Sequence, residues 1–190
     1  PSFAPGRVRG YSYDPERART LLAEAGYPGG RGLPPITLYT NKDYLDLCTF
    51  ITRQWQDLGV EVQIEMTESA TLRQMMSEGQ APFFRASWIA DYPDAESFLT
   101  VFYGGNPAPP NYTRFRHAGF DRLYEQALAE TSDSRRYDLY QRMDSILVEE
   151  APVIFLFYDE TAVFARRELQ GLSRNALNLL DTRRIRLKNE

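Results

Sequence analysis

The segment from Arg85 to Asp94 carries the residues best suited to bind a small charged ligand. Trp88 offers a flat apolar face, Asp91 offers a carboxylate, and Arg85 offers a planar cation that can hold a carboxylate through two hydrogen bonds. Together they suit a zwitterion, and each charge-assisted bond contributes about 1.5–3 kcal/mol where water is excluded. In the structural alternative, Trp88 belongs to the core and Arg85 and Asp91 neutralise each other. Spacing alone does not decide between the two.

The chain holds few candidates for catalysis. It has one His, His117, and one Cys, Cys48, so a two-histidine metal site or an internal disulfide cannot form within it. No Gly-x-Ser-x-Gly motif accompanies His117, which we expect to be a loop residue or a helix cap. Cys48 lies on a helical apolar stripe, which predicts a buried hydrophobic residue. Asp91 and Asp94 could supply the two carboxylates of a glycosidase-like hydrolase, the alternative from a different functional class.

The composition limits the classes of partner. The 190 residues carry a net charge of −4 and are 43% hydrophobic, as in a globular protein with one sizeable domain or two small ones. No stretch reaches the roughly 18 unbroken apolar residues that a membrane helix needs. A net negative charge does not favour the binding of polyanions such as nucleic acids. We therefore expect no nucleic-acid partner, no metal and no cofactor.

A parallel unit is predicted to position the Arg85–Asp94 segment. Asp14-Pro15-Glu16 combines an N-cap, a proline at the first helical position and an early acid, which indicates a helix start. Apolar spacing and alternation predict helices over 15–25, 44–58 and 67–78, and strands over 36–40, 60–66 and 83–88. Strand, helix and strand with short connections form a parallel βαβ unit. The glycine-rich loop 27–35 runs from helix to strand, the reverse of a phosphate-binding loop, and is expected to be a flexible connector.

The second half of the chain is predicted to be mainly helical. Helices are expected from about 120 to 128 and from 132 or 133 to 150, and the apolar stretch 153–157 is typical of a strand buried on both faces. The polar, interrupted segment 90–110 follows a parallel strand, where α/β proteins usually bind ligands. A third alternative is an interaction module whose aromatic loop, 98–112, docks another protein.

Four stretches, taken in order, resemble the bacterial extracellular solute-binding proteins of family 5, which are the oligopeptide, dipeptide and nickel receptors of ABC importers. The first is YDPERARTLLAEAGY at 13–27, and the second is WQDLGVEV at 55–62. The third is WIADYPDAESFL at 88–99, and the fourth combines NYTRF at 111–115, FDRL at 120–123 and EEAP at 149–152. Four ordered matches are far more specific than any single one.

The resemblance implies a fold and a division of the chain. The expected fold is α/β, a periplasmic-binding-protein-like II lobe whose mixed sheet has helices on both faces. Residues 1–152 would be the C-terminal ligand-binding lobe. Residues 153–190 would be return strands and a tail that pack on a first lobe, so that the isolated lobe could self-associate through its apolar stretch. The signal peptide would belong to the N-terminal part of the longer receptor.

The resemblance also implies a function without a chemical step. The lobe would bind oligo- or dipeptides non-covalently for import by ABC permease subunits, in the periplasm or another extracytoplasmic location. In peptide-binding members, the position of Asp91 receives the α-ammonium group, and that of Arg85 meets the carboxylate in some. Trp88 and Tyr92 would line the cleft, and Ser87 departs from the Gly commonly found there. Because the family includes receptors for nickel chelates, haem and oligosaccharides, those ligands are the alternatives within this class.

Overall fold

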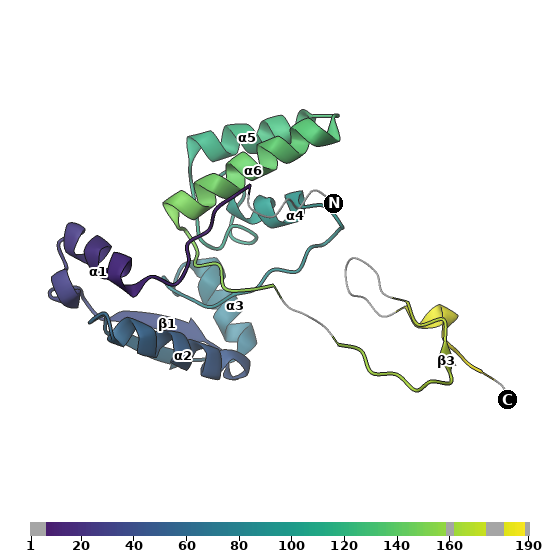
Figure 1. Cartoon of the computed structure of the whole chain (residues 1–190), viewed down its shortest axis with the longest axis horizontal. Coiled ribbons are helices and arrows are strands. Elements are labelled where there is room, and N and C mark those ends of the chain that lie inside the picture. The colour runs from purple at the N-terminus through teal and green to yellow at the C-terminus, as the bar shows by residue number, and fades with distance from the viewer. Residues whose placement is uncertain (1–6, 159–161, 174–180, 189–190) are drawn as a thin grey trace.

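The computed structural model describes residues 7–158, 162–173 and 181–188 (Figure 1). Its α-helices are α1 (Pro15–Glu24), α2 (Leu45–Gln56), α3 (Ser69–Glu78), α4 (Glu96–Leu99), α5 (Ala118–Ala129) and α6 (Asp133–Glu150). Its strands are β1 (Ile36–Thr40), β2 (Val62–Met66), β3 (Leu169–Gln170) and β4 (Arg186–Leu187). The 3-10 turns are η1 (Pro28–Gly30), η2 (Lys42–Tyr44), η3 (Thr100–Phe102) and η4 (Thr182–Arg184).

Local capping signals begin two of the helices where the sequence predicts them. The Asp14 carboxylate accepts a hydrogen bond from the backbone N–H of Arg17 at 2.9 Å, and Pro15 is the first residue of α1. Nδ1 of His117 accepts one from the N–H of Phe120 at 3.0 Å and so caps α5. The prediction that His117 is a cap is therefore confirmed.

The predicted βαβ unit is present. β1 and β2 pair in parallel, from Ile36 opposite Val62 to Thr40 opposite Met66, and α2 connects them. The third expected strand, 83–88, is shorter than predicted. It pairs in parallel with β1 only around the bridge between Tyr39 and Phe84, since no further ladder bonds form beyond it among the described residues.

Helices cover both faces of this sheet, as expected. Leu38 packs in a cluster with Cys48 of α2, whereas its neighbour Tyr39 packs against Leu72 and Met76 of α3. Successive strand residues point to opposite faces, so α2 and α3 lie on opposite sides of the sheet. Cys48 is buried, which confirms its prediction as a core residue.

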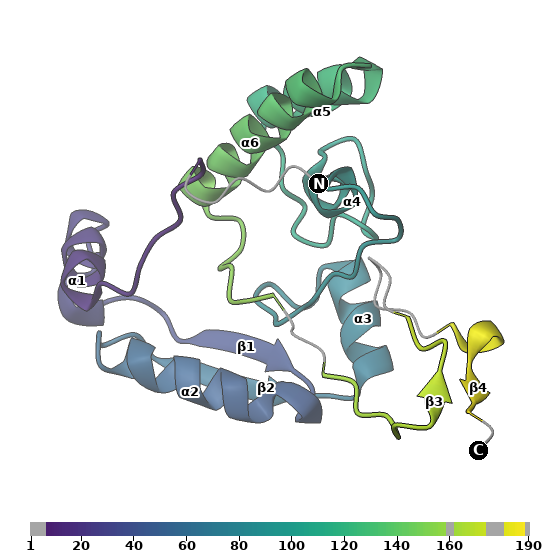
Figure 2. The ribbon, with the colours of Figure 1, turned by 45° about the vertical axis from the view of Figure 1, so that its right-hand side comes forward.

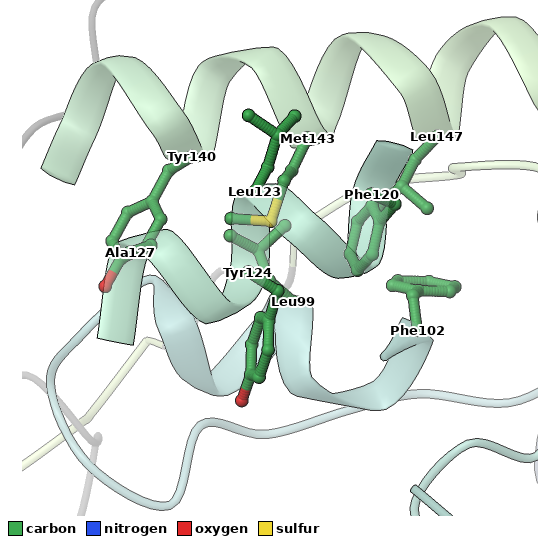
Figure 3. Close-up of a cluster of buried hydrophobic side chains, with 9 residues drawn as sticks. All are labelled: Leu99, Phe102, Phe120, Leu123, Tyr124, Ala127, Tyr140, Met143 and Leu147. Atoms are coloured by element: carbon green, nitrogen blue, oxygen red, sulfur yellow. The ribbon is translucent and has the colours of Figure 1, made fainter. Parts of the chain in front are cut away.

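A second core lies among α4, α5 and α6 (Figure 3). The two long helices pack along each other, and α4 contacts α6. Phe120 and Met143 are completely buried at its centre. This core fixes α4, the helix that directly follows the Arg85–Asp94 segment.

The glycine-rich loop after α1 differs from its prediction. Instead of forming a flexible connector, it folds into η1 and packs against the turn between α2 and β2. Gly30 and Gly59 both have positive φ, +74° and +82°, and their backbones approach so closely that neither position has room for a β-carbon. This contact between backbones explains why glycine occupies positions 30 and 59.

The antiparallel part of the expected mixed sheet does not form within the described residues. The stretch 153–157 makes no strand, and the prediction that it is a strand is wrong for this chain. Side chains from Ile154 to Tyr158 are exposed, because no neighbouring strand of the described chain lies alongside to supply ladder hydrogen bonds. Beyond it, β3 and β4 form a separate antiparallel pair, away from the helices and the first sheet (Figures 1 and 2). None of the described helices is both long enough and apolar enough to cross a membrane.

Candidate ligand-binding segment

The Arg85–Asp94 segment leaves the sheet where β1 ends. The backbone N–H of Arg85 donates to the carbonyl of Tyr39 at 2.9 Å, and the N–H of Tyr39 donates to the carbonyl of Phe83 at 2.9 Å. These bonds place Arg85 beside the last residues of β1. The segment therefore begins at the carboxyl edge of the parallel strands, the edge where α/β proteins usually bind ligands.

Arg85 is half-buried and stacked on an aromatic ring. Its Cζ lies 2.9 Å from the centroid of the Tyr44 ring, and one terminal nitrogen is 3.5 Å from Oγ of Ser87. No carboxylate pairs with Arg85 in the part of the chain that the structure describes.

Asp91 is exposed, and only its backbone is held. Its N–H donates to Oγ of the fully buried Ser97 at 3.0 Å. Among residues 7–158, 162–173 and 181–188, its carboxylate takes part in no hydrogen bond or ion pair. Arg85 and Asp91 therefore do not neutralise each other. The structural alternative, in which these two side chains form an ion pair, is wrong on this point.

The two aromatic residues of the segment differ in their surroundings. Trp88 is half-buried, and its Nε1 is covered without a hydrogen-bond partner in the described residues. Tyr92 is 44% exposed and lines a shallow hollow of about 460 Å³ with the start of α6. Arg85, Trp88 and Asp91 do not line that hollow. Of the four predicted site residues, only Tyr92 belongs to it.

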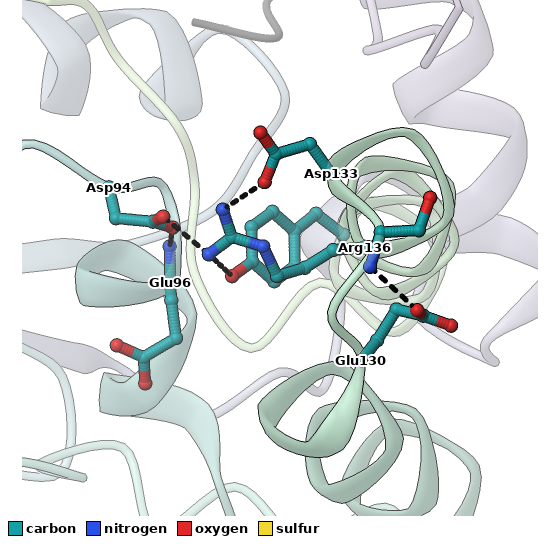
Figure 4. Close-up of polar contacts among 7 residues, drawn as sticks. Asp94, Glu96, Glu130, Asp133 and Arg136 are labelled. Carbon is teal, nitrogen blue, oxygen red and sulfur yellow. Dashed lines mark hydrogen bonds and ion pairs between the residues drawn. The ribbon is translucent and has the colours of Figure 1, made fainter.

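Asp94 is the anchor that ties the segment to α6 (Figure 4). One carboxylate oxygen accepts from Arg136 at 2.6 Å and the other from the N–H of Glu96 at 2.9 Å. Arg136 also donates to Asp133 at 3.0 Å and to the hydroxyl of Tyr140 at 3.3 Å. Burial raises the pKa of Asp94, but the Glu96 N–H and the Arg136 guanidinium outweigh it and hold this pKa below its usual value of 3.8. Burial, together with the charge of Asp94, raises the pKa of Tyr140 to about 12.

A buried contact continues this anchoring on the other side of α4. The hydroxyl of Tyr124 donates to the carboxylate of Glu96, and both side chains are buried. Burial and this hydrogen bond raise the pKa of Tyr124. Glu96 and Ser97 thus hold the C-terminal end of the segment by contacts that involve no ligand.

Replacing Arg136 by methionine is expected to lower the free energy of unfolding by about 1.5–3 kcal/mol at neutral pH, because Asp94 loses its charged donor. A carboxylate with a depressed pKa stabilises the fold above its unfolded pKa, near 3.8, and this contribution disappears as the pH falls through the lower folded value. The difference in the free energy of unfolding between wild type and variant should therefore become smaller below about pH 4.

Urea unfolding of the chain from pH 7 to pH 2.5 measures this difference. Arg135→Met is the control for the loss of an exposed ion pair, since Arg135 is the neighbouring residue on α6, its side chain is 71% exposed and its Nε lies 3.0 Å from the Glu130 carboxylate. If Arg136→Met lowers the free energy of unfolding only as much as the control does, or by the same amount down to pH 2.5, the anchoring role of Arg136 is contradicted.

Sequence reasoning missed three residues that shape the segment: Tyr44, Ser97 and Arg136. Each acts on a residue outside its own secondary-structure element, and Arg136 contacts Asp94 across 42 positions of sequence. The only local signal is the spacing of Asp133 and Arg136 on α6, which predicts a helical ion pair and not a contact with Asp94.

Comparison with known proteins gives this segment its context. Residues 1–110 match the family model of the bacterial extracellular solute-binding proteins, family 5 Middle. The chain is 32% identical over 152 residues to Heme-binding protein A of Haemophilus influenzae, covering 77% of this chain and 28% of that protein. It is 30% identical over 139 residues to the periplasmic murein peptide-binding protein MppA of Escherichia coli, covering 72% and 26%.

The fold agrees with solved relatives. A periplasmic oligopeptide-binding protein of Borrelia burgdorferi superposes with a TM-score of 0.68 at 25% identity, over 77% of this chain and 31% of that one. The chain thus spans between a quarter and a third of the length of these three proteins. It has the α/β fold of a periplasmic-binding-protein lobe. Because the family model covers more than half of its residues, the chain belongs to the bacterial extracellular solute-binding proteins of family 5.

Proposed function

We propose that the chain is the ligand-binding lobe of a receptor that captures a peptide without chemical change for import by an ABC transporter. The observation that carries this proposal is that Arg85 and Asp91 keep opposite charges free of ionic partners in the described structure, next to the carboxyl edge of a parallel sheet. Two of the relatives named above are called peptide-binding proteins. The permease partner and the extracytoplasmic location are parts of the same proposal.

Each end of a peptide has a complementary group in this segment. The Asp91 carboxylate would accept the α-ammonium group, and the Arg85 guanidinium would donate two hydrogen bonds to the terminal carboxylate of a short peptide. Trp88 and Tyr92 would line the cleft between these charges. The Asp91 backbone is held by Ser97, so the carboxylate starts from a fixed main-chain position.

The proposed division of the chain follows from its exposed C-terminal stretch. The buried core residues lie between Leu38 and Leu147, and Val153 packs against the helical core, whereas the apolar side chains from Ile154 to Tyr158 are exposed to solvent. We assign 1–152 to the ligand-binding lobe and 153–190 to return strands and a tail that pack on a first lobe. Without that lobe, the exposed stretch favours self-association of the chain.

The hydrolase alternative has weaker support. A glycosidase needs one carboxylic acid with a raised pKa, whereas the pKa of Asp94 is lowered and both its oxygens are engaged. Nickel chelates, haem and oligosaccharides remain alternative ligands for the same kind of receptor, and one relative is named for binding haem.

Asp91→Asn tests the proposal in the two-lobed receptor that contains this chain. Peptides of two to five residues, nickel chelates, haemin and small oligosaccharides are first screened by thermal shift, because a ligand at 100 times its dissociation constant adds about 2.7 kcal/mol of stability. For a peptide that binds, we expect the substitution to weaken affinity by about 10-fold or more, since one charge-assisted bond is lost. N-acetylated peptides should bind wild type and variant equally.

The control is Asp57→Asn, the same change of charge at the exposed C-terminal end of α2. Equal affinity of wild type and Asp91→Asn for a free peptide would show that Asp91 does not hold the ammonium group. Stabilisation by sugars or chelates alone would replace the peptide by another ligand class. Recovery of a cleaved ligand would favour the hydrolase.

A further inference from the structure

We propose that Tyr44 is a positioning residue for Arg85 and thereby sets the preference of the site for a ligand with a free carboxylate. The inference rests on the proposed function, because it assumes that Arg85 meets a carboxylate. It adds a residue from a different part of the chain, 42–44, which the family resemblance does not mark.

Tyr44 and Arg85 come from two neighbouring strand ends. Tyr44 closes η2, the turn that follows β1, and its N–H donates to the carbonyl of Asn41 at 3.2 Å. Arg85 follows the short third strand, and its backbone is bonded to Tyr39 of β1. Both residues are therefore attached to the carboxyl edge of the same sheet, and both are half-buried.

The contact between them is a cation–π contact. Cζ of Arg85 lies over the Tyr44 ring, 2.9 Å from the ring centroid. All five N–H donors of a guanidinium lie in its plane. Nε of Arg85 is buried without a hydrogen-bond partner in the described residues, so only the two terminal nitrogens can donate to a ligand. The contact with the ring limits the side chain to few rotamers.

The polar contacts of Arg85 leave its terminal nitrogens available for a ligand. Within the described residues, its only side-chain hydrogen bond is the 3.5 Å contact to Ser87, and no acid pairs with it. An unsupported arginine loses much rotamer freedom when it binds a carboxylate, which weakens binding. Because Tyr44 restricts Arg85 before the ligand arrives, this loss is smaller.

The ring, and not the phenol oxygen, makes the contact. The Tyr44 hydroxyl forms no hydrogen bond in the parts of the chain that are described. Phenylalanine should therefore replace tyrosine without loss, whereas leucine keeps an apolar side chain but removes the π-face. Tyr44→Phe and Tyr44→Leu form a matched pair.

The test uses alanine peptides of two to five residues and the C-terminal amides of the same peptides, titrated calorimetrically into the two-lobed receptor. We expect Tyr44→Leu to bind the free acids about tenfold more weakly than wild type and to bind the amides as wild type does. Tyr44→Phe should match wild type within twofold for both. In an Arg85→Met background, Tyr44→Leu should cause no further loss.

The outcomes separate this inference from the proposed function. Wild type that binds none of these peptides refutes the proposed function and the inference with it. Wild type that binds them, with Tyr44→Leu unchanged toward the free acids, refutes the inference alone. Equal losses toward acids and amides show a merely structural role for Tyr44, and urea midpoints of both variants identify a loss of folding directly.

Discussion

Replacing Phe120 by alanine is expected to lower the free energy of unfolding by about 3–5 kcal/mol, because the substitution opens a cavity at the centre of the helical core. The Phe120 side chain is 0% exposed. Its ring meets the ring of Phe115 edge to face, with centroids 5.8 Å apart, and it lies beside Phe102 and Leu147 (Figure 3). Contacts from three elements are lost at once, and a core built from long helices cannot collapse fully around the space.

Urea unfolding of wild type and variant measures this loss, with equal m-values as the sign that only stability has changed. Phe50→Ala is the control, because Phe50 lies on α2 with 63% of its surface exposed. The control should stay within about 0.5 kcal/mol of wild type. A loss below 1 kcal/mol for Phe120→Ala would mean that α5 and α6 do not share a packed core.

The same core connects stability to the candidate site. It holds α4 through Leu99, and α4 continues directly from the Arg85–Asp94 segment. Glu96 and Ser97, the first residues of α4, bond to Tyr124 and to the Asp91 backbone. The position of Asp91 thus depends on the packing of α4 and α5, which is how a rigid scaffold keeps a binding loop in place.

Local sequence signals predicted the elements that depend on near neighbours. The caps at Asp14 and His117 act over three residues, and the alternation in 60–66 reports the burial of one strand face. Such patterns are fixed by the geometry of a single helix or strand. The order of the helices and strands up to α6 could therefore be predicted, whereas the sequence pattern predicts Arg85 inside a longer third strand, 83–88.

The remaining features depend on contacts between distant segments. No local pattern links Arg136 to Asp94 or Tyr44 to Arg85, because their side chains meet only after the sheet and the helices have packed. The apolar pattern of 153–157 reports that a strand is normally buried, but it does not say by which neighbour. The described chain supplies no neighbouring strand, so the apolar stretch 153–157 cannot form the hydrogen bonds of a paired strand.

The packing of the glycine-rich loop 27–35 also depends on a contact with a distant segment. Disrupting that contact is expected to cause the second large loss of stability. Gly59→Ala is expected to destabilise the chain by about 2–5 kcal/mol. About 1–2 kcal/mol comes from placing a β-carbon on a left-handed residue. A further 1–3 kcal/mol comes from overpacking, since that carbon would overlap the backbone carbonyl of Gly29.

Gly32→Ala separates these two contributions. Gly32 has nearly the same φ, +84° against +82° for Gly59, but an added β-carbon there meets no atom within 4 Å. Both variants reduce the entropy of the unfolded chain equally, so this effect cancels between them. Urea unfolding should show a loss about 1–3 kcal/mol larger for Gly59→Ala. Equal losses would mean that the loop does not press on the turn between α2 and β2, and the sequence-based prediction of a flexible connector would then be right.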